Sequence, residues 1–167
     1  DENCIRPVFN DADLFTIKVQ VKTTGLSTVE DKYKAFIKQA IRARKDYRGS
    51  GTPTMFTTED ALTEMLLLED GMGRQLYTDE AALARKLRVA KIVTIPEMEG
   101  RKGAKGGNLA AVIVNLADYT VGADKGGAVS MFDDFDIDFN AQKYLIETRC
   151  SGALTSPYSA MAIEWAA

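Results

Sequence analysis

Alternation of apolar and polar side chains is the first pattern along this chain. It indicates half-buried strands, in which one face packs on a core and the other meets solvent. The stretch 109–116 is almost wholly apolar instead, which is typical of a central strand covered on both faces. Strands are predicted over residues 14–21, 91–95, 109–116, 129–139, 143–148 and 158–165, with a short apolar piece at 54–56.

Apolar residues at three- and four-residue spacing predict three helices between these strands. The first follows an N-cap at Ser27 or Thr28 and ends in a basic turn, which suits the negative end of the helix dipole. The other two are predicted over 57–68, with Thr57 as N-cap, and over 78–87. This order of elements predicts a mixed α+β fold with most strands late in the chain.

Composition reduces the number of function classes that fit this chain. The chain has 167 residues, 46% of them hydrophobic and 27% charged, and a net charge of −3, as in an ordinary globular domain. It contains no histidine, which removes the commonest general base and the commonest metal ligand. Cys4 and Cys150 form no CxxC pair and are interpreted as idle thiols, although a disulfide between them stays open. We therefore expect no enzyme, no catalytic residue and no cofactor.

The most acidic stretch, FDDFDIDFN over 132–140, resembles part of a calcium-binding loop. The oxygen ligands of such a loop would be Asp136, Asp138, Asn140 and Glu147. The sixth position of the loop is Ala141, however, where the sharp turn needs glycine. We therefore predict no specific metal site here.

A β-strand conformation would also account for the residue pattern of this stretch. Alternation would place Asp134, Asp136 and Asp138 on one face, about 7 Å apart, and the apolar side chains from Phe135 to Phe139 on the other. That carboxylate spacing is compatible with some glycosidases. A solvated acidic face above a buried aromatic face produces the same pattern more often, and this is the interpretation we favour.

Basic residues gather in two places. The loop 100–107, GRKGAKGG, lacks the Gly-Lys-Ser/Thr ending of a phosphate-binding P-loop, and no helix is predicted after it. It is interpreted as a flexible, solvated loop, with contact to a polyanion or a partner as the lesser alternative. The second cluster lies around the end of the first helix and has the same two interpretations.

Several segments together resemble the major capsid proteins of tailed bacteriophages and prophages. GTPTMFTTED at 51–60, LEDGMGR at 68–74 and LRVAKIV at 87–93 occur in the order that this family uses. The stretch 115–160 is similar to the C-terminal portion of one branch of it. The resemblance covers nearly the whole chain and implies the Hong Kong 97-like capsid fold.

That fold combines an axial domain near the capsomer centre with a peripheral domain. The resemblance implies that residues 26–128 with 151–167 form the axial domain, and that 1–25 and 129–150 contribute peripheral strands. The family's N-terminal arm, extended loop and spine helix do not precede this match. The sequence is therefore interpreted as a C-terminal portion of a capsid protein, and we expect it to be monomeric or weakly associated by itself.

The implied function is structural. Full-length proteins of this kind self-assemble into hexamers and pentamers of an icosahedral capsid that encloses DNA, so the implied location is the virion, after assembly in the bacterial cytoplasm. Expected partners are further copies of the chain and scaffold or portal proteins, with no specific DNA sequence and no membrane. Charges set the register of such contacts. Candidate interface residues are Arg42, Arg44, Lys45, Arg48, Arg101, Lys102, Lys105, Asp133, Asp134, Asp136 and Asp138.

Two alternatives remain at this point. An encapsulin-like nanocompartment shell would share the fold without the phage context. An enzyme could use the acidic strand around Asp134–Asp138 as a carboxylate or divalent-cation site. Acids that converge in a concave pocket would favour the enzyme, whereas acids spread over a flat edge would favour a shell.

Overall fold

A five-stranded sheet forms the centre of the computed structural model, which describes residues 8–123, 129–147 and 149–166. The strands in spatial order are β1 (Thr16–Val21), β9 (Ala160–Trp165), β4 (Leu109–Val114), β2 (Thr54–Thr57) and β3 (Ile92–Thr94). β4 is antiparallel to both of its neighbours, β9 and β2, while the outer pairs β1–β9 and β2–β3 are parallel.

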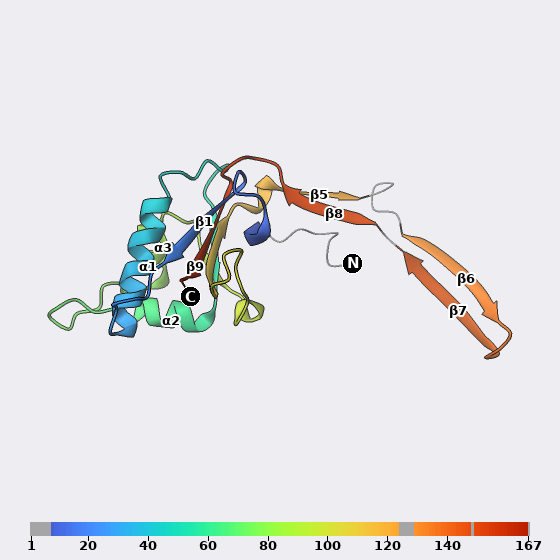
Figure 1. Cartoon of the computed structure of the whole chain (residues 1–167), viewed down its shortest axis with the longest axis horizontal. Coiled ribbons are helices and arrows are strands. Elements are labelled where there is room, and N and C mark those ends of the chain that lie inside the picture. Colours follow the sequence, from blue (N-terminus) through green and yellow to red (C-terminus); the bar gives the residue numbers. More distant parts are fainter. Residues whose placement is uncertain (1–7, 124–128, 148, 167) are drawn as a thin grey trace.

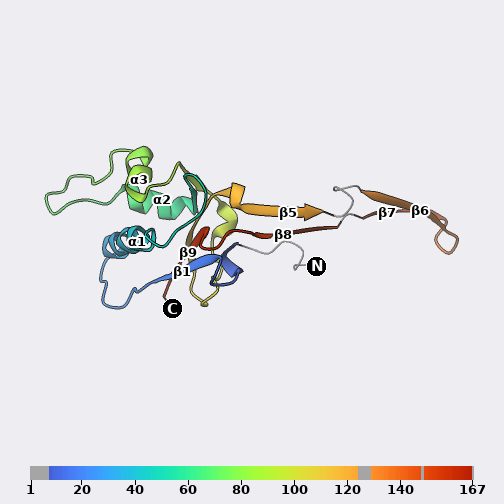
Figure 2. The ribbon, with the colours of Figure 1, turned by 90° about the horizontal axis from the view of Figure 1, so that it is seen from above.

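Three helices, α1 (Val29–Ala43), α2 (Glu59–Leu66) and α3 (Glu80–Leu87), cover one face of this sheet (Figures 1 and 2). Each begins at an N-cap whose side chain accepts a hydrogen bond from a backbone N–H of the first turn, namely Thr28, Thr58 and Asp79. None of the helices within the described ranges is both long and apolar enough to cross a membrane.

The prediction of Thr57 as the cap of α2 is wrong by one residue. Thr57 is the last residue of β2, is fully buried, and donates its hydroxyl to the carbonyl oxygen of Ala110 at 2.9 Å. Its neighbour Thr58 has the extended backbone of a cap and accepts from Ala61 N at 3.3 Å. Two adjacent threonines look alike in sequence, and strand pairing decides between them.

The core lies on both faces of the sheet, which is why all six residues of β4 are buried. Ala111 and Ile113 face the helices, together with Phe36 of α1. Val112 and Val114 face the opposite side, where η1 (Val8–Asn10) and η2 (Pro96–Met98) border a second, smaller cluster. The prediction of a doubly covered central strand at 109–116 is confirmed for Leu109–Val114.

Two antiparallel ribbons project from the sheet as a long arm (Figures 1 and 2). β5 (Tyr119–Ala123) pairs with β8 (Cys150–Leu154), and farther out β6 (Ser130–Asp136) pairs with β7 (Ala141–Glu147). β5 and β8 were not predicted, because their glycines and small side chains weaken the strand pattern. Pairing between β5 and β8 stabilises the extended conformation that their sequences favour only weakly.

Strand pairing also shows which segments belong to the compact part of the chain. β1 pairs with β9 along its whole length and lies in the central sheet, not with the β6–β7 ribbon. The compact part therefore includes residues 16–21, which the resemblance had grouped with the peripheral strands. The division into axial and peripheral domains stays a prediction.

Candidate assembly surfaces

The β6–β7 hairpin is an exposed apolar element at the far end of the arm. The prediction that the aromatic side chains of its acidic strand are buried is wrong for this chain. Phe135 is 51% exposed, Ile137 83% and Phe139 79%. A two-stranded ribbon has no second layer to cover either face, so alternation in its sequence cannot produce burial.

Of the four aspartates of the hairpin, Asp136 stabilises its turn. β6 ends at Asp136, and residues 137–140 form the turn, so Asp138 is not on the strand face predicted for it. The Asp136 carboxylate accepts from the backbone N–H of Asp138 at 3.1 Å and forms an ion pair with Lys143 of β7. Asn140 closes the turn with a left-handed φ of 48°, a conformation that asparagine tolerates.

Strand register places Asp133 and Asp134 on opposite faces of the ribbon. Residues directly opposite each other in the ribbon share a face. Asp133 lies opposite Tyr144, on the face that also carries Met131 and Phe135. Asp134 shares the other face with its cross-strand partner Lys143. The hairpin therefore has one mainly apolar face and one charged face, both open to contact.

The calcium-loop interpretation does not fit this geometry. Glu147, its twelfth-position ligand, lies opposite Ser130 at the base of the hairpin, whereas Asp136 lies at the turn. No group of three or more side chains suited to hold a metal ion occurs among the residues that the structure describes. The hairpin carboxylates are spread along an exposed ribbon instead of converging in a pocket.

Among the basic candidates near the end of α1, Arg44 differs from the others. Its guanidinium lies 4.0 Å from the centre of the Tyr47 ring and donates to the carbonyl oxygen of Arg88 at 3.2 Å. Burial lowers the pKa of Arg44 from its ordinary value. Arg44 is thus engaged within the chain, whereas Arg42 and Lys45 are exposed.

The glycine-rich loop 100–107 is held by a buried carboxylate that sequence reasoning missed. Glu164 of β9 is fully buried and accepts from the backbone N–H of Lys105 at 3.1 and 3.3 Å. A side chain at Gly103 would overlap that of Glu164, and one at Gly107 would overlap the carbonyl oxygen of Trp165. These two glycines therefore serve close packing on β9. Nothing in the sequence near the loop signals Glu164.

Arg101 and Lys102, the other candidates in this loop, are exposed. Lys105 is exposed as well, but its ammonium donates to the carbonyl oxygen of Lys18 on β1 at 3.3 Å. Hydrogen bonds to β9 and β1 thus hold Lys105 beside the sheet. The sequence had predicted a flexible loop, because glycine alone does not show what packs against it.

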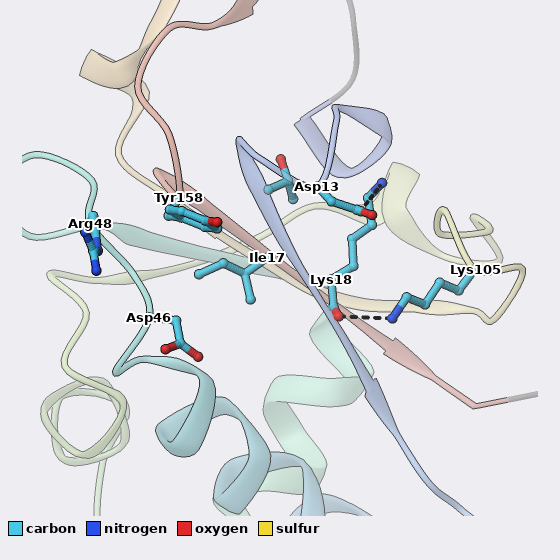
Figure 3. A pocket seen from close by; sticks show the side chains of 8 residues that line it. Asp13, Ile17, Lys18, Asp46, Arg48, Lys105 and Tyr158 are labelled. Carbon is cyan, nitrogen blue, oxygen red and sulfur yellow. Dashed lines mark hydrogen bonds and ion pairs between the residues drawn. The ribbon is translucent and has the colours of Figure 1, made fainter.

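A cavity of about 450 Å³ brings two of these candidates together (Figure 3). Arg48 and Lys105 both line it, together with Asp46 and the ion pair between Lys18 and Asp13, whose charged atoms are 3.0 Å apart. The cavity lies beside β1, below Tyr158. Its charges of both signs suit a polar contact with another protein surface.

No protein family model matches the chain, and neither does any curated protein. Solved structures match over most of its length. The mature capsid of bacteriophage PhiM1 matches with a TM-score of 0.56 at 12% identity, and a phage-related protein from Bordetella bronchiseptica RB50 with 0.55 at 16%. The capsid of an empty GTA particle matches with 0.54 at 15%.

The chain has the Hong Kong 97-like capsid fold. These matches cover 89%, 98% and 89% of the chain. In turn the chain spans 51%, 59% and 50% of the matched proteins. The fold that the resemblance implied is therefore confirmed.

Proposed function

We propose that this chain is part of a major capsid protein that builds the head shell of a phage or prophage particle by self-association. The observation that carries the proposal is the capsid fold, which the matched structures share over 89% to 98% of the chain. The proposed particle is an icosahedral shell of hexamers and pentamers that encloses DNA. The role is mechanical, and no catalytic activity is part of it.

The exposed hairpin supports this proposal. Apolar side chains as open as Ile137 and Phe139 are unfavourable in water, and such surfaces usually mark contacts with other proteins. In a shell of identical copies, neighbouring subunits can cover the hairpin. The proposal also includes scaffold or portal proteins as transient partners in the bacterial cytoplasm, and the virion as the final location.

The test is assembly of the complete product of the gene that encodes this chain. We expect closed particles by negative-stain microscopy after expression in bacteria. Soluble monomers at every concentration, with no particles, would contradict the proposal. Hydrolysis or ligand turnover that depends on Asp134 and Asp136 would favour an enzyme instead.

The hairpin tip gives a sharper prediction. We expect the double change Ile137→Ser and Phe139→Ser in the complete gene product to abolish particle formation, because it removes two apolar side chains available for contacts between copies. The midpoint of thermal unfolding of the 167-residue chain should stay unchanged, since neither side chain is buried in it.

The control for this change is Val29→Ser, which alters a side chain that is 50% exposed at the start of α1. Particles should form normally from this variant. Normal particles from the hairpin variant would show that the tip takes no part in assembly, although the proposed shell role could still hold.

A further inference from the structure

A groove with an apolar floor and a basic rim lies between α1, α3 and the loop that joins α2 to α3. Its volume is about 480 Å³. Ile37 and Ile41 of α1 form one wall, and Leu68, Leu76 and Tyr77 of the loop form the floor. Among the described residues that line the groove, none is acidic.

The rim of the groove is positively charged. Lys34, Lys38 and Arg42 recur at every fourth residue of α1, and Lys86 faces them from α3. Lys34 pairs with Glu30 at 3.2 Å. Within the described part of the chain, no ion pair involves the other three cations. An apolar floor below unpaired cations selects a partner that is both acidic and apolar.

The exposed face of α2 has this character. The helix sequence, EDALTEML, contains three acids and no base. Glu59, Thr63 and Leu67 follow one another at four-residue spacing, so they share a face, and all three are exposed. Leu67, the C-cap, is 54% exposed. This face is about 12 Å long, as is the run from Lys34 to Arg42.

α2 cannot enter the groove of its own chain. Leu62 and Met65 bury its inner face in the core between the sheet and the helices, and the helix lies along the lower edge of the compact part in Figure 1. The groove and the acidic face are therefore two different surfaces of the same packed core. A contact between them requires a second copy.

We propose that the acidic face of α2 docks in the basic groove of a neighbouring copy. Leu67 would cover the apolar floor, while Glu59 and Asp60 would face the cations of the rim. A contact between two different surfaces is heterologous, so it can repeat around a ring of copies. The inference rests on the proposed shell function and adds the surfaces through which neighbouring subunits meet.

The hairpin tip is a second acidic and apolar surface among the described residues, but it fits the groove less well. The carboxylate of Asp136 is already paired with Lys143, and Asp138 is the only other acid of the turn. The α2 face has no cation of its own to neutralise it. Charge complementarity therefore favours α2.

Disulfide trapping tests the contact in the 167-residue chain. Cys4→Ser and Cys150→Ser give a background without thiols, into which Lys38→Cys or Thr63→Cys is introduced. Neither variant alone should form dimers on mild oxidation, whereas a mixture of the two should. The chain that carries both changes should give a ladder of oligomers. Each copy then has one cysteine in its groove and one on its α2 face, so it can be cross-linked to two neighbours.

Charge reversal makes the test specific. Arg42→Glu in the groove partner should lower the yield of the mixed dimer about tenfold, since like charges then face each other. Glu59→Lys with Asp60→Lys in the α2 partner should restore it. Arg85→Glu is the matched control, because Arg85 is exposed on α3 but does not line the groove. Thermal unfolding of each variant checks that the fold is intact.

Three outcomes would overturn the contact: no mixed dimer, no rescue by the second reversal, or more efficient trapping of Lys38→Cys by Ile137→Cys in the hairpin tip. A double variant that stops at dimers would overturn the heterologous arrangement and indicate a two-fold pair. Normal particles from the complete gene product carrying Arg42→Glu would refute the groove contact and leave the shell function standing. If the unaltered product forms no particles, the shell function itself fails.

Discussion

Ile163→Ala is expected to lower the free energy of unfolding of the chain by about 2–5 kcal/mol, as measured by chemical denaturation. Ile163 is fully buried in β9, which lies between β1 and β4 in the central sheet and pairs with both. It belongs to the cluster between the sheet and the helices, which also contains Phe36 of α1. Truncation removes apolar contacts and leaves a cavity that this packing cannot easily fill.

Ile137→Ala is the matched control, because the residue type and the change are the same. Ile137 is 83% exposed at the tip of the hairpin, so its replacement should alter the free energy of unfolding by no more than about 0.5 kcal/mol. A larger loss for Ile137 than for Ile163 would mean that the hairpin packs on the chain in solution. The buried-strand interpretation from sequence would then be right after all.

Gly107→Ala is expected to destabilise the chain by about 1–3 kcal/mol, because a β-carbon at this position would overlap the carbonyl oxygen of Trp165. The clash is with backbone at the end of β9, which cannot move without disturbing the central sheet. The loop must shift instead, and its bonds to the buried Glu164 would weaken. Chemical denaturation measures the loss.

Gly71→Ala is the control for this change. A β-carbon at Gly71 meets nothing within 4 Å, and the residue does not have a left-handed φ. Its replacement should leave stability unchanged or raise it slightly, since alanine restricts the unfolded chain. Equal effects at positions 71 and 107 would show that the loop 100–107 is not packed on β9 as described.

For the candidate surfaces, residue types alone predicted which charged side chains are exposed, but not which of them lie close together. The sequence identified the charged residues that lie outside the core, such as Arg42 and Lys105, because a long charged side chain is almost never fully buried without a partner. It did not identify which of them meet. Arg48 and Lys105 share a cavity only because the segments that carry them flank β1, and neither position is near the other in sequence.

The sequence by itself determined the local elements of this protein. Helices over Val29–Ala43 and Glu80–Leu87, and the covered strand Leu109–Val114, follow from apolar spacing and from caps such as Thr28 and Asp79, which act within a few residues. Extended similarity to capsid proteins also indicated the fold before any pairing was known.

Tertiary structure alone decided which faces are covered. The alternation around Phe135 is the same whether a second layer packs on the strand or not. Only the two-stranded arm shows that none of the described residues forms such a layer. The same holds for the loop 100–107, in which Gly103 and Gly107 are explained by Glu164 and Trp165, more than fifty residues later. Periodicity reports which side of an element is apolar, whereas burial depends on partners that are distant in the chain or belong to another copy.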